Sequence, residues 1–299
     1  MLQEHGEKRF GCDFDGVITH PEKFADAYLN QYIPRFCQHF SINQEFARWY
    51  FQQEQEFMVQ NPEQYHFRVN NIRVLTGPGD PIIMTRLAAE QALRYWKHKE
   101  KRAVHIEESR WGTSLTDIYV DAYRNTECIL NNGASKFLQT VQKLLPKNFF
   151  IISGSDAMDI RRGLLANINS SILHVNDLPI YGKAGKSHVV FTADIPVPKY
   201  VRMTGYPHHV PIRKPTYYNF LKDASNDFSA HLILASDIGE VDLALGAYLG
   251  MSTILVSHYL TSSWDKDHHS ENKDDQTNTR AHVTNLDELL EVVTRQIQQ

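Results

Sequence analysis

The sequence has few cysteines, no long apolar run and no excess of either charge, and each of these absences excludes a class of protein. Its three cysteines are an odd number, widely spaced, and lack the paired spacing of zinc ligands. The 31 basic and 35 acidic residues leave a net charge of -4, so we expect no binding of a nucleic acid polymer. No apolar segment approaches the roughly 20 residues that a membrane-spanning helix needs, so we expect no membrane span.

The first residues and the cysteine content bear on location. Residues 1–8 lack the apolar core of a secretory signal peptide. Few, unpaired cysteines suit a reducing compartment. We therefore expect a cytoplasmic protein, and export by a route that needs no signal peptide stays open as an alternative.

The patterns of apolar and aromatic residues divide the chain into two parts. Hydrophobic residues make up 42% and charged residues 22% of the sequence, which is ordinary for a globular protein. Strand and helix patterns alternate in residues 1–20 and again in residues 133–299, whereas residues 21–132 show helix-like spacing of aromatic side chains. We therefore predict a discontinuous α/β core with a parallel central sheet, interrupted by a mainly α-helical insertion.

Local patterns predict two further strands and a loop in the core. Short strands are expected at residues 171–177 and 188–192. Residues 261–280 are polar and poor in apolar side chains, which predicts a loop.

The first predicted strand ends in two carboxylates, Asp13 and Asp15, followed by Gly16. Residues two apart in a strand point to the same side, and a glycine lets the backbone turn sharply. The strand would then present both carboxylates at its carboxyl edge, where ligands bind in open α/β sheets. A surface turn with two solvated aspartates is the alternative, and the residues farther along the chain argue against it.

Three more polar residues stand at related places farther along the chain. Ser153 and Asp237 each follow an apolar strand, and Lys214 opens the helix before the second of these strands. Carboxylates from distant strands can share a Mg²⁺ ion, which prefers oxygen ligands. A hydroxyl and an ammonium group are suited to hold a phosphoryl group beside the metal. Together with Asp13, these residues predict a phosphoryl-transfer site.

Four motifs follow one another along the chain. They are Asp13-Phe14-Asp15-Gly16-Val17, Ser153 with Gly154, Lys214-Pro215, and Ser236-Asp237-Ile238-Gly239-Glu240-Val241-Asp242. In this order they resemble the motifs of the haloacid dehalogenase (HAD) superfamily, in its phosphatase branch. Such enzymes carry a cap domain where residues 21–132 lie. Two features depart from the family: Ser236 stands in place of a glycine, and Lys214 lies farther from Ser153 than usual.

The resemblance implies a three-layer Rossmann-like (HAD-like) core and a Mg²⁺-dependent phosphomonoester hydrolase that works through an aspartyl-phosphate. Asp13 would attack phosphorus, and Asp15 would protonate the leaving oxygen and then activate water. The dehalogenases of the superfamily lack the second aspartate, so the presence of Asp15 favours phosphate chemistry.

The resemblance also implies which residues hold the phosphoryl group. Ser153, Gly154 and Lys214 would bind it and balance its charge. Lys183 and Lys186 compete with Lys214 for the place of the lysine, and the sequence favours Lys214, which a proline and a helix follow as in the family.

For the metal, the resemblance implies a Mg²⁺ site formed by Asp13, the backbone carbonyl of Asp15, and Asp237. Asp242 or Glu240 would lie beside these ligands and orient them.

Several readings of the function stay open. A phosphomutase uses the same groups and passes the phosphoryl to another acceptor. A protein (tyrosine) phosphatase is a third possibility, and a catalytically silent binding module is a fourth, against which the intact aspartates argue. The aromatic and arginine residues in residues 21–132 favour a nucleotide or aryl phosphate as substrate, by stacking and cation–π contact. A phosphoprotein is the other expected partner.

Overall fold

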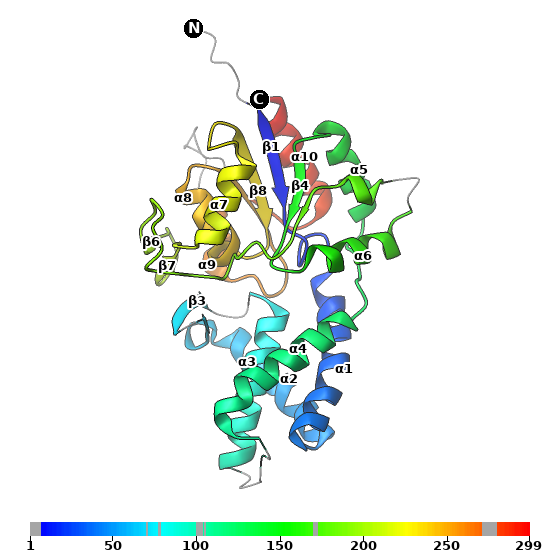
Figure 1. Cartoon of the computed structure of the whole chain (residues 1–299), viewed down its shortest axis with the longest axis vertical. Coiled ribbons are helices and arrows are strands. Elements are labelled where there is room, and N and C mark those ends of the chain that lie inside the picture. Colours follow the sequence, from blue (N-terminus) through cyan, green and yellow to red (C-terminus); the bar gives the residue numbers. More distant parts are fainter. Residues whose placement is uncertain are drawn as a thin grey trace. The chain divides into compact units, whose positions relative to one another are not determined.

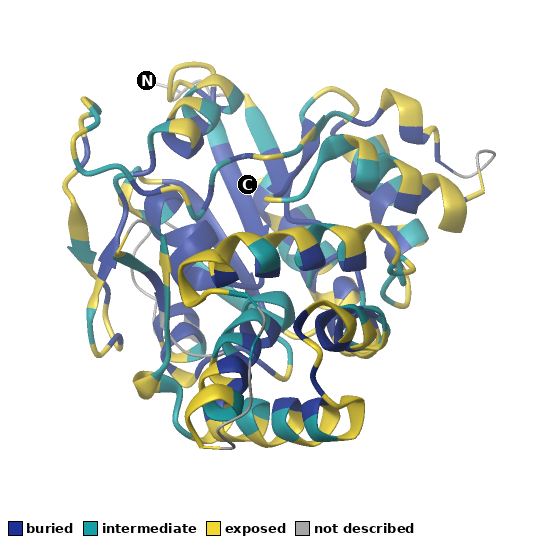
Figure 2. Cartoon of the chain, turned by 60° about the horizontal axis from the view of Figure 1, so that its bottom comes forward, coloured by how far each residue is buried: buried dark blue, intermediate teal, exposed yellow. Residues whose placement is uncertain are grey.

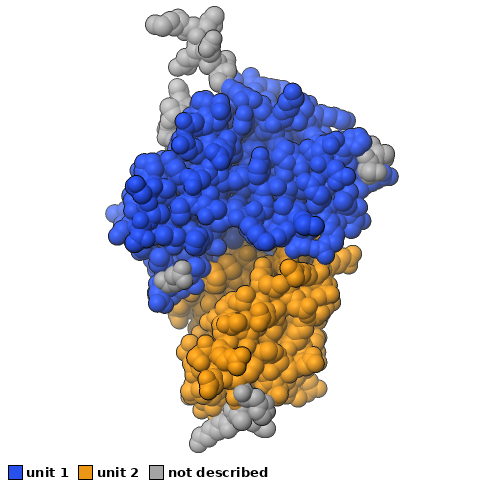
Figure 3. Space-filling view, viewed as in Figure 1, with its two compact units in different colours: residues 1–20, 68–75, 129–299 blue, residues 21–67, 76–128 orange. Residues whose placement is uncertain are grey.

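The structure (Figure 1), a computed structural model, describes residues 7–69, 71–76, 79–99, 104, 106–169, 173–270 and 280–299. The chain divides into two compact units, coloured blue and orange in Figure 3. The first unit comprises Met1–His20, Arg68–Leu75 and Ile129–Gln299, and the second comprises Pro21–Phe67 and Thr76–Cys128. Residues 68–75 and 129–132, which the sequence pattern assigns to the insertion, thus group with the α/β part.

The first unit is a parallel β-sheet with helices on both faces. Its elements in chain order are β1 (Lys8–Cys12), α5 (Ala134–Leu144), β4 (Phe149–Ile152), α6 (Ala157–Asn167), η3 (Val175–Asp177), β5 (Ile180–Tyr181), β6 (Tyr200–Arg202), β7 (His209–Pro211), α7 (Pro215–Ala224), β8 (His231–Ser236), η4 (Gly239–Leu243), α8 (Ala244–Tyr248), β9 (Ser252–Val256), α9 (Ser263–Ser270), β10 (Arg280–Val283) and α10 (Leu286–Gln298). Within the part of the chain that the structure describes, six strands form the sheet in the order β10-β9-β8-β1-β4-β5. Every neighbouring pair is parallel, so the predicted α/β core is confirmed.

The register of the sheet brings distant strand ends together. Cys12, the last residue of β1, is paired with Ile151 of β4 on one side and with Ala235 of β8 on the other. The residues that follow these strands therefore leave the sheet at one shared edge. Neighbouring parallel strands have this property because their carboxyl ends point the same way, and such edges bind ligands in open α/β sheets.

Both faces of the sheet are buried, as expected for parallel strands that helices cover. On one face Phe10 stacks on Phe149 and meets the edge of Phe137 from α5, which packs beside α10. On the other face Leu234 and Leu255 belong to a cluster with side chains of α7, α8 and α9. Figure 2 shows the strands in the dark blue of buried residues and the outer faces of the helices in yellow.

The second unit is mainly helical. Its elements are α1 (Pro21–Phe40), α2 (Gln44–Gln60), η1 (Pro62–Gln64), α3 (Pro81–His98), η2 (Glu108–Arg110) and α4 (Trp111–Arg124). The strands β2 (His66–Val69) and β3 (Ile72–Thr76), which join α2 to α3, fall across the division, because Arg68–Leu75 belongs to the first unit. Along α1, Tyr28, Tyr32 and Phe36 recur at a spacing of four, which places them on one face of the helix. Tyr32 and Phe36 both contact the ring of Phe51 in α2, so aromatic side chains form much of this unit's own core.

The polar stretch at 261–280 contains a helix where the sequence predicts a loop. Residues 263–270 form α9, residues 271–279 lie outside the described residues, and β10 begins at Arg280. The prediction was wrong for α9 because several of its polar side chains, Asp265, His268 and His269 among them, are buried and hydrogen-bonded within the protein. Asp265 is buried and accepts hydrogen bonds from Tyr206 and Ser262.

The strand predicted at 188–192 does not form. Arg213 donates to the backbone carbonyls of Phe191 and Val197, so a side chain takes the place of a neighbouring strand there. In the segment predicted as a strand at 171–177, residues 171 and 172 lie outside the described residues and Val175–Asp177 is a short helix. Among the described helices, none is both long enough and apolar enough to span a bilayer.

Candidate active site

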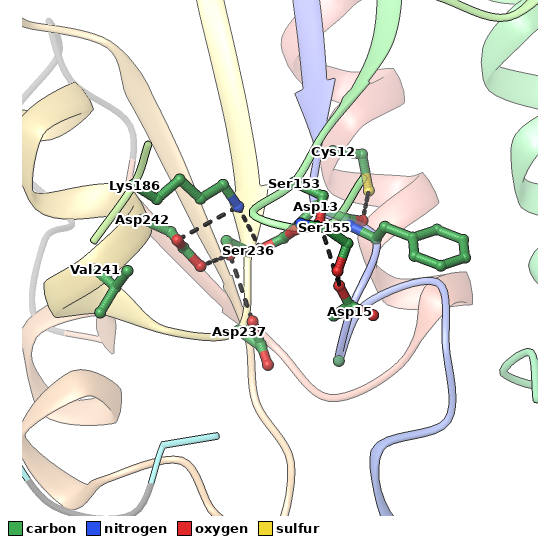
Figure 4. Close-up of polar contacts among 12 residues, drawn as sticks. Cys12, Asp13, Asp15, Ser153, Ser155, Lys186, Ser236, Asp237, Val241 and Asp242 are labelled. Atoms are coloured by element: carbon green, nitrogen blue, oxygen red, sulfur yellow. Dashed lines mark hydrogen bonds and ion pairs between the residues drawn. The ribbon is translucent and has the colours of Figure 1, made fainter. Parts of the chain in front are cut away.

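Asp13 lies at the centre of a group of polar side chains at the carboxyl edge of the sheet (Figure 4). Its backbone N–H donates to the carbonyl of Ala235 at 2.8 Å, which continues the pairing of β1 with β8 one residue past the strand. Asp13 is only 5% exposed. Its Oδ1 accepts a hydrogen bond from the N–H of Phe14 at 2.7 Å, and its Oδ2 faces Lys186 and Ser236. This carboxylate is therefore held in one orientation.

Three buried carboxylates meet at this point. Asp13, Asp237 and Asp242 each offer an oxygen atom, and these atoms lie within 4.8 Å of one another. Asp237 follows β8 and Asp242 lies in the single helical turn η4. An all-oxygen set of ligands suits a hard divalent cation such as Mg²⁺. The donor atoms present therefore fit a metal of that kind.

The electrostatics of Asp13 also fit a nearby cation. Burial raises the pKa of Asp13 well above its ordinary value, the Lys186 ammonium lowers it, and the neighbouring Asp242 and Asp237 raise it again. A bound divalent cation would be the largest local charge and would favour the ionised carboxylates. The Lys186 ammonium therefore balances only part of the negative charge of the three carboxylates.

Lys186, and not Lys214, contacts Asp13. The Lys186 ammonium Nζ lies 2.5 Å from Asp13 Oδ2 and 3.3 Å from Asp242 Oδ1, and the side chain is 5% exposed. Burial alone would lower the pKa of Lys186, but the carboxylates of Asp13 and Asp242 outweigh burial and raise it. The ammonium group is therefore charged at neutral pH and lies where it can bind an anion beside Asp13.

Lys214, the lysine that the sequence favours for phosphate binding, has other partners in the structure. This side chain is completely buried, and its Nζ donates to the backbone carbonyls of Glu240 at 3.1 Å and Val241 at 2.5 Å. Burial lowers the pKa of Lys214 to about 8. Lys214 thus ties the start of α7 to the turn η4, which carries Asp242. The third candidate, Lys183, is exposed and pairs with Asp156 at 2.6 Å.

Asp15 lies next to two serines from the loop after β4. Asp15 Oδ2 accepts hydrogen bonds from Ser155 Oγ at 2.6 Å and from Ser153 Oγ at 3.2 Å. The backbone N–H of Ser155 donates to Ser153 Oγ at 3.0 Å, so the loop that includes Gly154 folds around the Ser153 hydroxyl. Ser153 was expected here on sequence grounds, whereas Ser155 was not. Ser155 lies only two residues after Ser153, and this spacing is the sequence signal that could have identified it.

Asp242 and Glu240 occupy different surroundings. Asp242 belongs to the carboxylate cluster itself: it pairs with Lys186 and accepts a hydrogen bond from Ser236. Glu240 instead has its carboxylate 2.9 Å from His208 Nε2 and its backbone carbonyl bonded to Lys214. Asp242 was expected only to orient the metal ligands. Its place in the cluster means that it could itself bind the metal.

Ser236 links the nucleophile candidate to the cluster. Its hydroxyl Oγ lies 2.6 Å from Asp13 Oδ2, hydrogen bonds to Asp242 Oδ2, and lies 3.5 Å from Asp237 Oδ1. A glycine, which the HAD pattern has at this position, would lack these contacts. Because a hydroxyl donates only one proton, Ser236 can satisfy one of these carboxylates as donor at any moment.

Asp237 passes directly over Gly16. Gly16 has a φ of 75°, and a Cβ there would collide with the Asp237 carboxylate. Only glycine combines that backbone conformation with room for the carboxylate. On its other side, Asp237 Oδ2 lies 3.0 Å from Nε2 of His258, a residue that the sequence pattern did not single out.

The fold of this chain is similar to that of solved hydrolase structures. No protein-family model and no curated protein sequence matches this chain. The structure of YfnB from Bacillus subtilis, assigned to the HAD hydrolases and solved bound to magnesium, is 12% identical over 97% of this chain and 100% of that one, with a TM-score of 0.50. An L-2-haloacid dehalogenase from Xanthobacter autotrophicus is 16% identical over 96% of this chain and 98% of that one, with a TM-score of 0.44. A Haemophilus somnus protein predicted to be a phosphoglycolate phosphatase is 10% identical over 96% of this chain and 98% of that one, with a TM-score of 0.47.

Proposed function

We propose that this chain, which has the fold of the HAD hydrolases, is a Mg²⁺-dependent phosphomonoester hydrolase that works through an aspartyl-phosphate. The observation that carries the proposal is the surroundings of Asp13. One buried carboxylate has an ammonium group at 2.5 Å, two further carboxylates within metal-binding distance, and a second aspartate two residues away. A nucleophile, a cation site, an anion-binding lysine and an acid–base group are the parts that phosphoryl transfer through a carboxylate requires.

In the first step Asp13 attacks the phosphorus atom of the substrate. A bond forms between an Asp13 carboxylate oxygen and phosphorus, and the bond from phosphorus to the leaving oxygen breaks. Asp15, in its protonated form, gives its proton to that leaving oxygen, so the alcohol departs neutral. Lys186 balances the charge that spreads over the phosphoryl oxygens in the transition state.

In the second step water removes the phosphoryl group from Asp13. Asp15 now accepts a proton from the attacking water, whose oxygen forms a bond to phosphorus while the bond to Asp13 breaks. The products are inorganic phosphate and free Asp13, with Asp15 protonated again. The hydroxyls of Ser155 and Ser153 hold Asp15 near Asp13 through both steps.

The metal would be held by Asp13, Asp237 and Asp242, together with the backbone carbonyl of Asp15. When bound, Mg²⁺ supplies positive charge that neutralises phosphate oxygens and aligns them with the nucleophile. Ser236 and Lys186, which already contact two of these carboxylates, would keep them in place around it.

Asp15 favours phosphate esters over haloacids as substrates. A halide leaves as a stable anion and needs no proton, whereas an alkoxide leaving group does, so an acid–base residue beside the nucleophile serves ester cleavage. A phosphomutase would use the same residues. Inorganic phosphate released into solution distinguishes hydrolysis from transfer to a second substrate.

We propose further that the helical second unit acts as the cap that selects the substrate. Buried aromatic side chains such as Tyr32 and Phe36 belong to its own core, but Trp49 and Phe57 are 54% and 44% exposed. Exposed aromatic and arginine side chains favour flat leaving groups, so we expect nucleotides and aryl phosphates, including phosphotyrosine in peptides, to be preferred over hexose phosphates.

The test is an assay of inorganic phosphate released from an aryl phosphate with purified protein and Mg²⁺. Release that disappears with excess chelator and returns with Mg²⁺ is the expected result. A comparison of kcat/KM for a nucleoside monophosphate, a phosphotyrosine peptide and a hexose phosphate then tests the preference. No release from any phosphate ester would refute the hydrolase, and a faster hexose phosphate would refute the preference.

A further inference from the structure

His258 makes a buried hydrogen bond to a carboxylate of the candidate metal site. Its Nε2 lies 3.0 Å from Asp237 Oδ2, and the side chains of His258 and Asp237 are 8% and 7% exposed. His258 lies just after β9, and Asp237 directly follows β8, the strand beside β9. The contact therefore joins the ends of two adjacent strands of the sheet.

The hydrogen bonds of the imidazole determine which nitrogen carries the proton. His258 Nδ1 lies 3.1 Å from the backbone N–H of Leu260, which can only donate. Nδ1 must therefore be the acceptor, and in the neutral ring the proton is on Nε2. The Nε2–H group then donates to Asp237 Oδ2.

The backbone around His258 is itself fixed. The N–H of His258 donates to Thr261 Oγ1 at 2.8 Å, and the N–H of Thr261 donates to the carbonyl of His258 at 3.1 Å. Thr261 and Leu260 are buried. The imidazole thus projects from a short closed turn and cannot follow the carboxylate if the latter rotates.

Asp237 is confined from two sides as a result. Its Oδ2 lies between Gly16, where no Cβ fits, and His258 Nε2. Its Oδ1 lies 3.5 Å from Ser236 Oγ, the hydroxyl that bonds Asp13. One carboxylate oxygen therefore contacts His258, while the other faces the Ser236 hydroxyl, which also contacts Asp13.

We propose that His258 is a positioning residue for the metal: by binding Asp237 Oδ2 it presents Oδ1 to the cation shared with Asp13. The inference rests on the proposed function only in taking Asp237 as a metal ligand. Groups that orient a metal ligand through a hydrogen bond typically change metal affinity by about 10- to 100-fold when removed. His258 belongs to this class of residue and does not touch the substrate.

Two substitutions separate the contact to Asp237 from the contact to Leu260. In His258→Asn the side-chain oxygen can replace Nδ1 as acceptor for Leu260, but the shorter side chain does not reach Asp237. In His258→Gln the amide nitrogen can replace Nε2 as donor to Asp237. His231→Asn is the matched control, because His231 is also hydrogen-bonded, to Ser252 at 3.0 Å, but lies at the opposite end of β8.

The experiment measures Mg²⁺ binding to the resting proteins by calorimetry, without substrate, after circular dichroism and thermal unfolding in chelator have established that each variant is folded. We expect Mg²⁺ affinity to fall about 10- to 100-fold in His258→Asn, to recover largely in His258→Gln, and to stay unchanged in His231→Asn. If His258→Asn does not fold, the test is the Mg²⁺ affinity of His258→Gln compared with wild type. Largely retained affinity in His258→Gln supports the proposal, and a large loss contradicts it.

Other results would overturn the role of His258, the metal dependence or the hydrolase activity. Wild-type affinity in His258→Asn, or a loss as large in His258→Gln as in His258→Asn, would overturn the role of His258. A wild-type protein that binds no Mg²⁺ would overturn both this inference and the proposed metal dependence. A protein that shows the expected pattern of binding but hydrolyses no phosphate ester would keep His258 as a positioning residue and refute only the hydrolase.

Discussion

Lys186 Nζ lies 2.5 Å from Asp13 Oδ2, and both side chains are almost completely buried. The two residues lie 173 positions apart: Asp13 directly follows β1, and Lys186 lies in the segment after β5. A buried ammonium group beside a buried carboxylate is costly unless further polar contacts satisfy both groups, and here Lys186 also contacts Asp242 while Asp13 accepts a hydrogen bond from Ser236. The pair marks the place where an anion would meet both a positive charge and the nucleophile.

The two buried lysines should respond differently to substitution. In the proposed mechanism Lys186 supplies charge that stabilises the transition state, so kcat should fall about 10²- to 10³-fold in Lys186→Met while the protein stays folded. Lys214→Met removes hydrogen bonds to two backbone carbonyls, so it should lower thermal stability more than Lys186→Met does. Steady-state kinetics and thermal unfolding measure both effects. Near-normal kcat in Lys186→Met with a large loss in Lys214→Met would return the phosphate-binding role to Lys214.

Asp15 and Ser155 should act as a unit. Asp15→Asn leaves the nucleophile intact but removes the proton donor and acceptor, so turnover should fall by ~10²–10⁴. Ser155→Ala should give a smaller loss in kcat and a changed pH profile, because the hydroxyl at 2.6 Å no longer holds the carboxylate. Combining the two changes should cost little more than Asp15→Asn alone. Fully additive losses would show that Ser155 acts independently of Asp15.

Replacing the metal ligands should change the dependence on Mg²⁺. Asp237→Asn and Asp242→Asn should each raise the Mg²⁺ concentration needed for half-maximal activity, because each removes a negative charge from the cluster. Ca²⁺ should replace Mg²⁺ poorly, since its longer and looser coordination suits in-line transfer less. Activity measured against metal concentration tests this. An unchanged requirement in Asp242→Asn would place that residue outside the metal site.

The stability of the first unit should depend on pH through Asp265. Burial raises the pKa of Asp265 from its ordinary value to about 7, with Glu240 adding to the shift. Between pH 4 and 7 the folded protein then binds more protons at this residue than the unfolded chain does. The contribution of Asp265 to stability is therefore complete at about pH 4 and is lost as the pH rises through 7.

The check for Asp265 is the free energy of unfolding in denaturant at several pH values. The difference in stability between wild type and Asp265→Asn should shift in favour of Asp265→Asn as the pH rises from 4 to 8. A difference that stays constant across this range would show that Asp265 is ionised in the folded protein at every pH tested.

The parts of the site that follow strands could be predicted from the sequence. Asp13, Ser153 and Asp237 each come directly after an apolar strand, and parallel neighbours bring such positions to one edge of the sheet. The alternation of strands and helices likewise predicts the α/β core. These inferences depend only on local pattern and on the geometry of parallel sheets.

The residues in irregular segments could not be predicted in the same way. Lys186 lies between β5 and α7 in a segment without periodicity, so nothing local indicates that its side chain reaches Asp13. Asp265 belongs to the polar stretch 261–280, which predicts a solvated loop, and His258 lies just before that stretch, yet both are buried by contacts with residues far away in the sequence. Lys214 shows the converse case, since its motif predicts a phosphate contact and the side chain bonds to backbone carbonyls.

Trapping of the phosphorylated enzyme tests the central claim most directly. The protein is mixed with an aryl phosphate and Mg²⁺, quenched in acid within the first turnover, digested and analysed by mass spectrometry for a phosphoryl group. We predict a phosphorylated peptide with the modification on Asp13, more abundant in Asp15→Asn than in wild type and absent from Asp13→Asn. Hydrolysis by Asp13→Asn at a rate near that of wild type, or a phosphoryl group on another residue, would contradict the mechanism.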